Sequence, residues 1–253
     1  MFNRRLFIKF NIGDIMKLTA ILITLLSGIS FLIGYIITKF VKNEKKLVTF
    51  SVGFSFTIIL GLVFFDLLPE CLELLESRLL IIICVLVGIS ILKLLDIFIP
   101  NHEHEGNKKN HMEHIGLISA LALFLHNIIE GTAIYTTSIN SLSLGFFTAL
   151  GVSFHNIPLG IQISSLIKDK QEKTFLLSSL VFSSVIGIII INIFKITLNN
   201  TLTGVLISLT LGMLIYISMF ELLCEVKEHI KKKELQIGII LGIIIILIGH
   251  FIH

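Results

Sequence analysis

Two apolar stretches of this chain carry nearly the same polar motif, His126-Asn127-Ile128-Ile129-Glu130-Gly131 and His155-Asn156-Ile157-Pro158-Leu159-Gly160. Imidazole and carboxylate groups together favour borderline divalent cations such as zinc, iron(II), manganese and cadmium, whereas magnesium and calcium prefer more oxygen. Because residues i and i+4 share a helix face, His126 and Glu130 would present their side chains to one point. The predicted ligand core is His126, Glu130 and His155. Asn127 and Asn156 are predicted as weaker ligands or as groups that orient the ligands.

Glycine and proline in the motifs predict how the two helices pack. Gly131 and Gly160 end the motifs and would let these two helices approach each other closely. Pro158 has no N–H to donate, so the carbonyl of Phe154 becomes available as an oxygen ligand or water contact.

The composition places these motifs inside a membrane. The chain has 253 residues, of which 55% are hydrophobic and 15% charged, whereas soluble domains carry about 25% charged residues. The apolar residues fall in blocks of about 20, the length of a membrane-spanning helix. A soluble domain is excluded, and the net charge of +3 is no sign of nucleic-acid binding. We predict an all-α polytopic membrane protein with eight spans, at 18–40, 47–68, 79–99, 115–138, 143–167, 174–194, 201–224 and 235–252.

The distribution of lysine predicts the orientation. The odd-numbered loops hold Lys39, Lys42, Lys45, Lys46, Lys108, Lys109, Lys168, Lys170, Lys173, Lys227, Lys231, Lys232 and Lys233, whereas the even loops hold only Arg78 and Lys195. Cytoplasmic loops are enriched in Lys and Arg, so both termini are predicted outside the cell membrane. Residues 1–17 form an N-terminal tail in this interpretation, with Met16 as an alternative start, and residues 18–253 form a single transporter domain.

A second pair of matched strings indicates an inverted repeat. Span two ends in Phe65-Asp66-Leu67-Leu68-Pro69-Glu70 and span seven in Phe220-Glu221-Leu222-Leu223-Cys224-Glu225. The two spans run in opposite directions, as do the two spans with the His-Asn motifs. This predicts a 3+2+3 inverted-repeat bundle with a binding site near the midplane, although chance matching of leucine-rich strings is an alternative. Asp66 and Glu70 would lie at the outer mouth of a cation pathway, and Glu221 and Glu225 at the inner one.

The segment 100–114 is predicted to be a His-rich cytoplasmic loop. It contains His102, His104, His111 and His114 together with three glutamates. Tracts of this composition bind metal, so the loop would hold metal transiently. A solvated loop with incidental histidines is the alternative.

These features together resemble the ZIP family of divalent-metal transporters, the Zrt- and Irt-like proteins. The resemblance rests on HNIIEG, HNIPLG, the DLLPE end of span two, eight spans with both ends outside and the His-rich third loop, and it covers the chain from about Met16. It implies a 3+2+3 bundle in which metal crosses between spans four and five into the cytoplasm through an elevator-like movement. Many bacterial relatives have HNxPEG in both helices, whereas Leu159 replaces the second glutamate here. Span six also has no acidic residue, so we predict one principal metal ion.

Three functions are compatible with these sequence features. The first is a transporter for which zinc is the most favoured substrate, with iron(II), manganese or cadmium as further candidates and no cofactor. The second is an intramembrane hydrolase in which His126 and His155 bind zinc and Glu130 is the general base, although catalytic zinc usually has three protein ligands. The third is a metal sensor that relies on the loop. A homodimer is left open, because the G-x-x-x-G match at Gly238 and Gly242 is too common in membrane helices to decide it.

Overall fold

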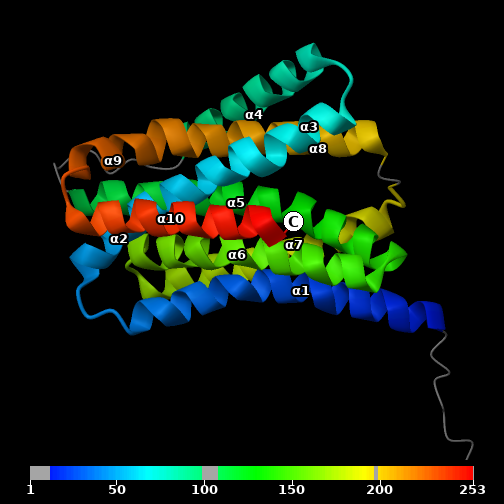
Figure 1. Cartoon of the computed structure of the whole chain (residues 1–253), viewed down its shortest axis with the longest axis horizontal. Coiled ribbons are helices and arrows are strands. Elements are labelled where there is room, and N and C mark those ends of the chain that lie inside the picture. Colours follow the sequence, from blue (N-terminus) through cyan, green and yellow to red (C-terminus); the bar gives the residue numbers. More distant parts are fainter. Residues whose placement is uncertain (1–11, 99–107, 197–198, 253) are drawn as a thin grey trace, which may run out of the picture.

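The computed structural model describes residues 12–98, 108–196 and 199–252, and within these ranges the chain is helical and has no strand (Figure 1). Side chains are described for these ranges apart from residues 12, 98, 108–111 and 249–252. The α-helices are α1 Ile12–Lys39, α2 Glu44–Gly61, α3 Leu68–Leu74, α4 Arg78–Phe98, α5 Lys108–Asn140, α6 Leu142–Leu166, α7 Lys170–Ile193, α8 Asn200–Tyr216, α9 Leu223–His229 and α10 Lys233–Ile252. Two π-helical segments, η1 Leu62–Leu67 and η2 Ile217–Leu222, join α2 to α3 and α8 to α9.

Seven helical stretches of the described chain are long and apolar enough to cross a membrane, which confirms a polytopic helical membrane protein. They correspond to the first seven predicted spans, and the eighth falls on α10. The outward faces carry exposed apolar side chains, for example Leu79, Ile82 and Leu86 on α4. A soluble protein rarely exposes such a continuous apolar surface, whereas lipid covers it at no cost.

The helices extend beyond the predicted spans at several ends. α1 begins at Ile12, so residues 12–17 are helical and do not belong to a tail. α5 begins at Lys108, seven residues before the predicted start of span four. The segment 108–114 is therefore part of a helix, and the predicted loop 100–114 is shorter than expected.

Polar side chains at the loop ends explain where several helices begin. The side chains of Asn43, Ser141, Asp169 and Asn199 accept hydrogen bonds from backbone N–H groups in the first turns of α2, α6, α7 and α8. These N–H groups have no partner within the helix, so such caps stabilise the helix start and fix its position.

The helices pack into two groups around α5 and α6 (Figure 1). In one group, α1 packs on α6 and α7, and α7 packs on α5. In the other, α2 packs on α10, and α4 packs on α8. α5 and α6 contact each other, and each also contacts a helix of the second group, α8 for α5 and α2 for α6.

The two π-helical segments lie at the matched strings of the sequence. η1 contains Phe65, Asp66 and Leu67, and η2 contains Phe220, Glu221 and Leu222 at the same positions of a six-residue segment. Such π-helical turns inside α-helices are rare and concentrate at functional sites. The two strings therefore share a local backbone conformation as well as a sequence pattern.

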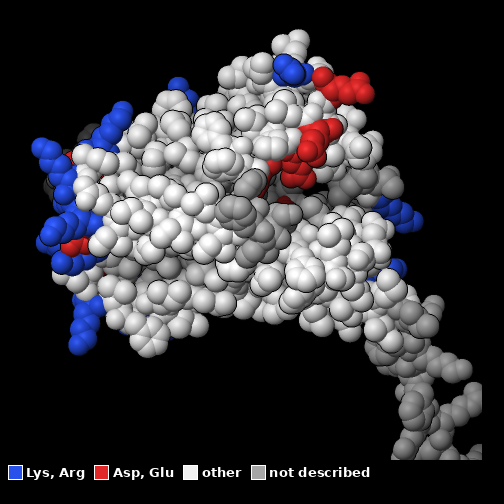
Figure 2. All heavy atoms as spheres, viewed as in Figure 1, with Lys and Arg blue, Asp and Glu red and all other residues white. Residues whose placement is uncertain are grey.

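One end of the molecule is cationic. The turns between α1 and α2 and between α9 and α10 meet there, and Lys46 of α2 forms a 2.9 Å ion pair with Glu234 of α10. Figure 2 shows blue Lys and Arg side chains gathered at this end, while red carboxylates lie in a hollow toward the other end. The carboxylates in the hollow thus lie away from the lysine-rich end.

Candidate metal site

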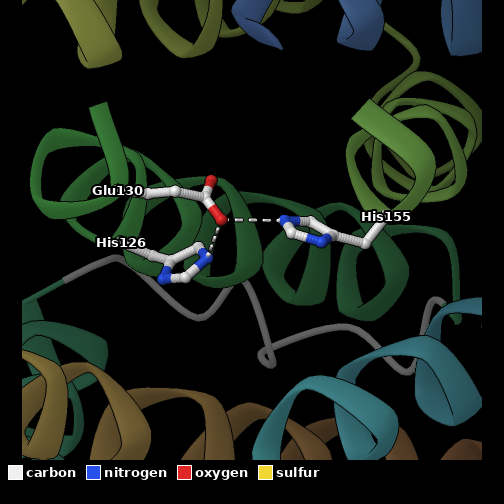
Figure 3. Close-up of side chains that lie close together, drawn as sticks. All are labelled: His126, Glu130 and His155. Carbon is white, nitrogen blue, oxygen red and sulfur yellow. Dashed lines mark ion pairs between the residues drawn. The ribbon is translucent and has the colours of Figure 1, made fainter. Parts of the chain in front are cut away.

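Three side chains from two neighbouring helices converge near the middle of the bundle. His126 and Glu130 project from α5, and His155 projects from α6 toward them (Figure 3). The Oε1 atom of Glu130 lies 3.1 Å from Nε2 of His155 and 3.6 Å from Nε2 of His126. All three ligand atoms lie within 4.8 Å of one another.

The two imidazole nitrogens that face Glu130 form ion pairs with its carboxylate and make no hydrogen bond to any other described residue. The side chains are only 4% exposed for His126, 14% for His155 and 16% for Glu130. The ligand-type atoms of this buried cluster have only one another as partners, an arrangement that could hold a metal ion.

The spacing fits a metal ion of zinc's size. Zn–N distances of about 2.0–2.1 Å in a tetrahedral site place ligand atoms about 3.3 Å apart. The measured separations of 3.1 and 3.6 Å from the Glu130 oxygen bracket this value. Small movements of the side chains would therefore bring all three atoms to bonding distance of one ion.

A cavity of about 540 Å³ reaches these ligands. Its lining includes His126, Glu130 and His155 together with Asp66 and Glu70. Both of these acids are exposed, whereas the three ligands are largely buried. The cavity thus connects an acidic surface to the buried ligand cluster. Thr148, Thr203 and Thr210 also line it, and sequence reasoning had not singled them out.

The two asparagines of the motifs do not line this cavity. Asn156 is buried and donates a 3.1 Å hydrogen bond from Nδ2 to the backbone oxygen of Ser27 on α1. Asn127 is also buried, but neither its Nδ2 nor its Oδ1 has a partner among the described residues. In this conformation Asn156 fixes α6 against α1, and neither asparagine joins the His-Glu-His cluster.

The motif glycines contact other helices than expected. Gly131 lies against the backbone of Ser184 on α7, and Gly160 lies against the backbone of Phe31 on α1. In return, Gly187 of α7 and Gly34 of α1 lie against the carbonyls of Ile128 and Ile157, the third residue of each motif. The prediction that Gly131 and Gly160 serve the contact between α5 and α6 is wrong. Gly131 brings α5 close to α7, and Gly160 brings α6 close to α1.

Leu159 occupies the position where a second carboxylate would stand. Its side chain is fully buried within the main apolar core and does not line the cavity. Glu130 is thus the single carboxylate in the cluster of metal-ligand type on α5 and α6.

The acids of the second matched string differ from those of the first in exposure. Glu221 and Glu225 are buried and do not line the cavity. Glu225 also belongs to a second group on α9 whose ligand atoms lie within 4.8 Å, formed with Glu228 and His229. The ring nitrogen Nδ1 of His229 lies 3.6 Å from Oε2 of Glu225.

The four histidines of the predicted loop 100–114 differ in where they lie. His102 and His104 lie outside the described residues, and His111 lies in the first turns of α5 with its side chain undescribed. His114 is not in a loop: it lies in α5, is buried, and its Nε2 is 2.6 Å from Oδ1 of Asp96. The helix starts early enough to place His114 against α4, so it is engaged with Asp96 in this conformation.

Asp96 joins three helices. It lies in α4, contacts His114 of α5 and accepts a 2.8 Å hydrogen bond from the hydroxyl of Tyr216 in α8. No spacing rule connects these three residues, because they come from distant parts of the chain.

A bundle of apolar helices around a buried His-Glu-His cluster defines an integral membrane protein with a candidate metal site. Comparison with known proteins gives the family: a model described as ZIP Zinc transporter matches residues 101–252. Three bacterial relatives, each named Zinc transporter ZupT, match nearly full length. That of Chlorobaculum parvum is 30% identical over 89% of this chain and 93% of its own. Those of Clostridium perfringens and Chlorobium chlorochromatii are 28% and 27% identical, over 94% and 92% of this chain and 97% and 96% of theirs.

The chain therefore belongs to the ZIP family, which confirms the resemblance drawn from its motifs. The family consists of transporters and not of enzymes, so the hydrolase alternative is rejected. Metal is accordingly a substrate of this protein and not its cofactor.

Proposed function

We propose that the chain carries divalent cations, zinc foremost, into the cytoplasm, with His126, Glu130 and His155 as the ligands of the ion in transit. The observation that carries the proposal is the cavity that joins exposed Asp66 and Glu70 to these three ligands. Carboxylates concentrate cations at its surface, and the imidazoles below select borderline metals such as zinc. Iron(II), manganese and cadmium are the further candidates.

We infer that the eight predicted spans form a 3+2+3 inverted repeat. The π-helical segments at equivalent positions support it, and so do the reciprocal glycine contacts of α5 with α7 and α6 with α1. The pairing of α2 with α10 matches that of α8 with α4, as exchange of spans two and three with seven and eight requires. Inverted repeats supply two alternative forms of one packing, which is the basis of alternating access.

The proposed orientation places the cationic end of the bundle in the cytoplasm of a cell-membrane protein. The lysines gathered at that end follow the positive-inside rule (Figure 2). Both termini are then outside, the His-rich loop is cytoplasmic, and Asp66 and Glu70 face outward. In this orientation Glu221 and Glu225 lie on the cytoplasmic side, where the cation would leave the pathway.

The contrast between the matched acids supports an outward-open conformation. Asp66 and Glu70 are exposed beside the cavity, whereas Glu221 and Glu225 are buried. An inward-open form would reverse this contrast by exposing Glu221 and Glu225, with the ion released past them.

We propose one principal metal ion at the midplane. Leu159 is buried in the apolar core, and Asn156 is bonded to α1, so neither completes a second strong site in this conformation. Asn127 and Asn156 are proposed as weak or orienting groups. A site with one carboxylate binds loosely enough for release, which transport requires.

The loop histidines are proposed to hold metal briefly after it leaves the pathway. To separate this role from that of a sensor, a deletion must spare α5, because residues 108–114 are helical. Removal of residues 100–107 should leave metal flux largely intact, because the loop is proposed to hold metal only after it leaves the pathway. A sensor would lose its response.

A homodimer would need a face other than the G-x-x-x-G motif of α10. Gly238 lies against the backbone of Phe50, and Gly242 against Thr57, both on α2. This motif is therefore used within the chain.

The test is zinc uptake into proteoliposomes that contain the purified protein. We expect His126→Ala and Glu130→Ala each to lower the initial rate about tenfold or more. Glu44→Gln, which changes an exposed carboxylate on α2, serves as the matched control and should transport normally. Undiminished uptake by both site variants would refute the proposed pathway.

A further inference from the structure

The seam between α5 and α6 continues beyond the His-Glu-His cluster as a second polar pair. Ser119 precedes His126 by seven residues on α5, and Gln162 follows His155 by seven residues on α6. Seven residues are two turns of a helix, so each residue lies on the same face as its histidine, about 10 Å along the axis. Because α5 and α6 run in opposite directions (Figure 1), both displacements point toward the lysine-rich end.

Gln162 is fully buried and only half satisfied. Its Nε2 donates a long 3.4 Å hydrogen bond to Oγ of Ser119, which is also fully buried. Its Oε1 has no hydrogen-bond partner among the described residues. A buried amide oxygen without a hydrogen-bond partner is energetically unfavourable. We therefore expect Oε1 of Gln162 to gain a partner in another conformation of the protein.

The helix that faces this position adds another unpartnered oxygen. Ser51 of α2 and Ser165 of α6 are joined by a 2.6 Å hydrogen bond between their hydroxyls. Because α2 and α6 are antiparallel, Ser55, one turn after Ser51, lies near the depth of Gln162. Ser55 is fully buried, and its Oγ has no partner either.

We propose that Oε1 of Gln162 is a ligand in a second, transient position for the divalent cation, with the unpartnered hydroxyl of Ser55 as a neighbouring oxygen donor. This proposal rests on the proposed transport function and extends it to the step after release from the His-Glu-His cluster. The cation reaches this position when α5 and α6 separate and the long bond from Gln162 to Ser119 breaks. In the present conformation the position is closed, since none of the three residues lines the cavity.

The chemistry of this position suits passage rather than storage. Its donors are neutral oxygens, which bind a divalent cation more weakly than a carboxylate and two imidazoles do. Oxygen donors favour manganese over the softer cadmium, so Gln162 also adds a filter that the nitrogen-rich cluster lacks.

The experiment compares Gln162→Met and Gln162→Glu with the wild type in proteoliposomes. Methionine has a similar length but no amide oxygen. We expect Gln162→Met to lower the manganese uptake rate about tenfold and cadmium uptake much less, while equilibrium zinc binding to the purified protein stays unchanged. Gln162→Glu should bind one further equivalent of zinc and transport it more slowly, because the added carboxylate retains the ion.

Two controls separate this proposal from simpler explanations. Gln236→Met alters an exposed glutamine of α10 and should leave all rates unchanged. Ser119→Ala removes the hydrogen bond but keeps Oε1 of Gln162, so a purely structural role of that bond would make this variant resemble Gln162→Met. We expect it to keep the manganese-to-cadmium ratio of the wild type, and a Gln162→Met-like ratio would overturn the proposal.

The outcomes also separate this proposal from the proposed function. Normal uptake by His126→Ala would refute the transport pathway as a whole. Loss of uptake by His126→Ala, together with unchanged metal ratios in Gln162→Met and no added equivalent in Gln162→Glu, would refute the Gln162 position alone. If Gln162→Met cannot be recovered as folded protein, the zinc stoichiometry of Gln162→Glu decides.

Discussion

The Oε1 atom of Glu130 lies 3.1 Å from Nε2 of His155 and thereby links α5 to α6 at the buried end of the cavity. The same oxygen lies 3.6 Å from Nε2 of His126, one turn away on its own helix. A single carboxylate oxygen thus stands between two imidazoles from different helices. A relative movement of α5 and α6 would change the Glu130–His155 separation, which gives the site a direct means of binding and releasing an ion.

Restoring a second carboxylate should make stability depend on metal. Leu159→Glu buries a charge in an apolar core and should lower the thermal unfolding temperature of the purified protein in detergent. We expect zinc to recover this loss more than it stabilises the wild type, because the new carboxylate gains a cation. Leu159→Gln is the control without the charge. Equal effects of zinc on both variants would mean that a carboxylate at position 159 does not reach the metal.

The acids beside the cavity should govern capture of the ion. The double variant Asp66→Asn, Glu70→Gln should raise KM for zinc uptake about tenfold at low ionic strength and leave the maximal rate nearly unchanged, because the charges attract the cation without binding it at the midplane. The difference should shrink at high salt as screening grows. A lower maximal rate with unchanged KM would contradict a role in capture.

The glycine contacts should be sensitive to a single methyl group. Gly131→Ala and Gly160→Ala place a Cβ against the backbone of α7 and α1 and should each cost about 1–3 kcal/mol of stability. Gly13→Ala is the matched control, because a Cβ there meets nothing within 4 Å. Thermal unfolding in detergent measures the difference. Equal stability of all three variants would show that α5 and α6 are not held by these contacts.

His114 should matter for stability rather than for metal capture. His114→Phe removes the 2.6 Å contact with Asp96 and leaves that carboxylate with the Tyr216 hydroxyl, at a cost of about 1–3 kcal/mol. Tyr216→Phe should cost less than His114→Phe, and the double variant should show non-additive losses because all three groups share one network. Full stability of His114→Phe combined with reduced zinc binding would contradict this account and support the original prediction that His114 binds metal.

The sequence predicted the helical spans and the approach of His126 to Glu130 because both depend on local patterns. Apolar blocks locate the spans, and spacing along a helix brings His126 and Glu130 to one face. The start of α5 was placed too late because polar residues such as Lys109 and Glu113 extend a helix beyond the apolar block. The partners of Gly131 and His114 depend on tertiary packing, which spacing within one helix does not specify.

The role proposed for Gln162 could be predicted only in part from the sequence. Its position seven residues after His155 places it on the same face of α6, and this signal is present in the sequence. Only the packing of α5 on α6 and the unpartnered Oε1 show that it differs from an ordinary interhelical contact.

The most direct measurement is zinc X-ray absorption spectroscopy on purified protein with less than one equivalent of zinc. Replacing His102, His104, His111 and His229 by alanine removes the loop histidines and the imidazole of the second ligand-type group, so the spectrum reports the buried site. We expect two imidazoles and one carboxylate, with Zn–N distances of about 2.0–2.1 Å. His155→Ala should lose one imidazole and zinc uptake together. An identical spectrum for His155→Ala would contradict a cation site formed by His126, Glu130 and His155.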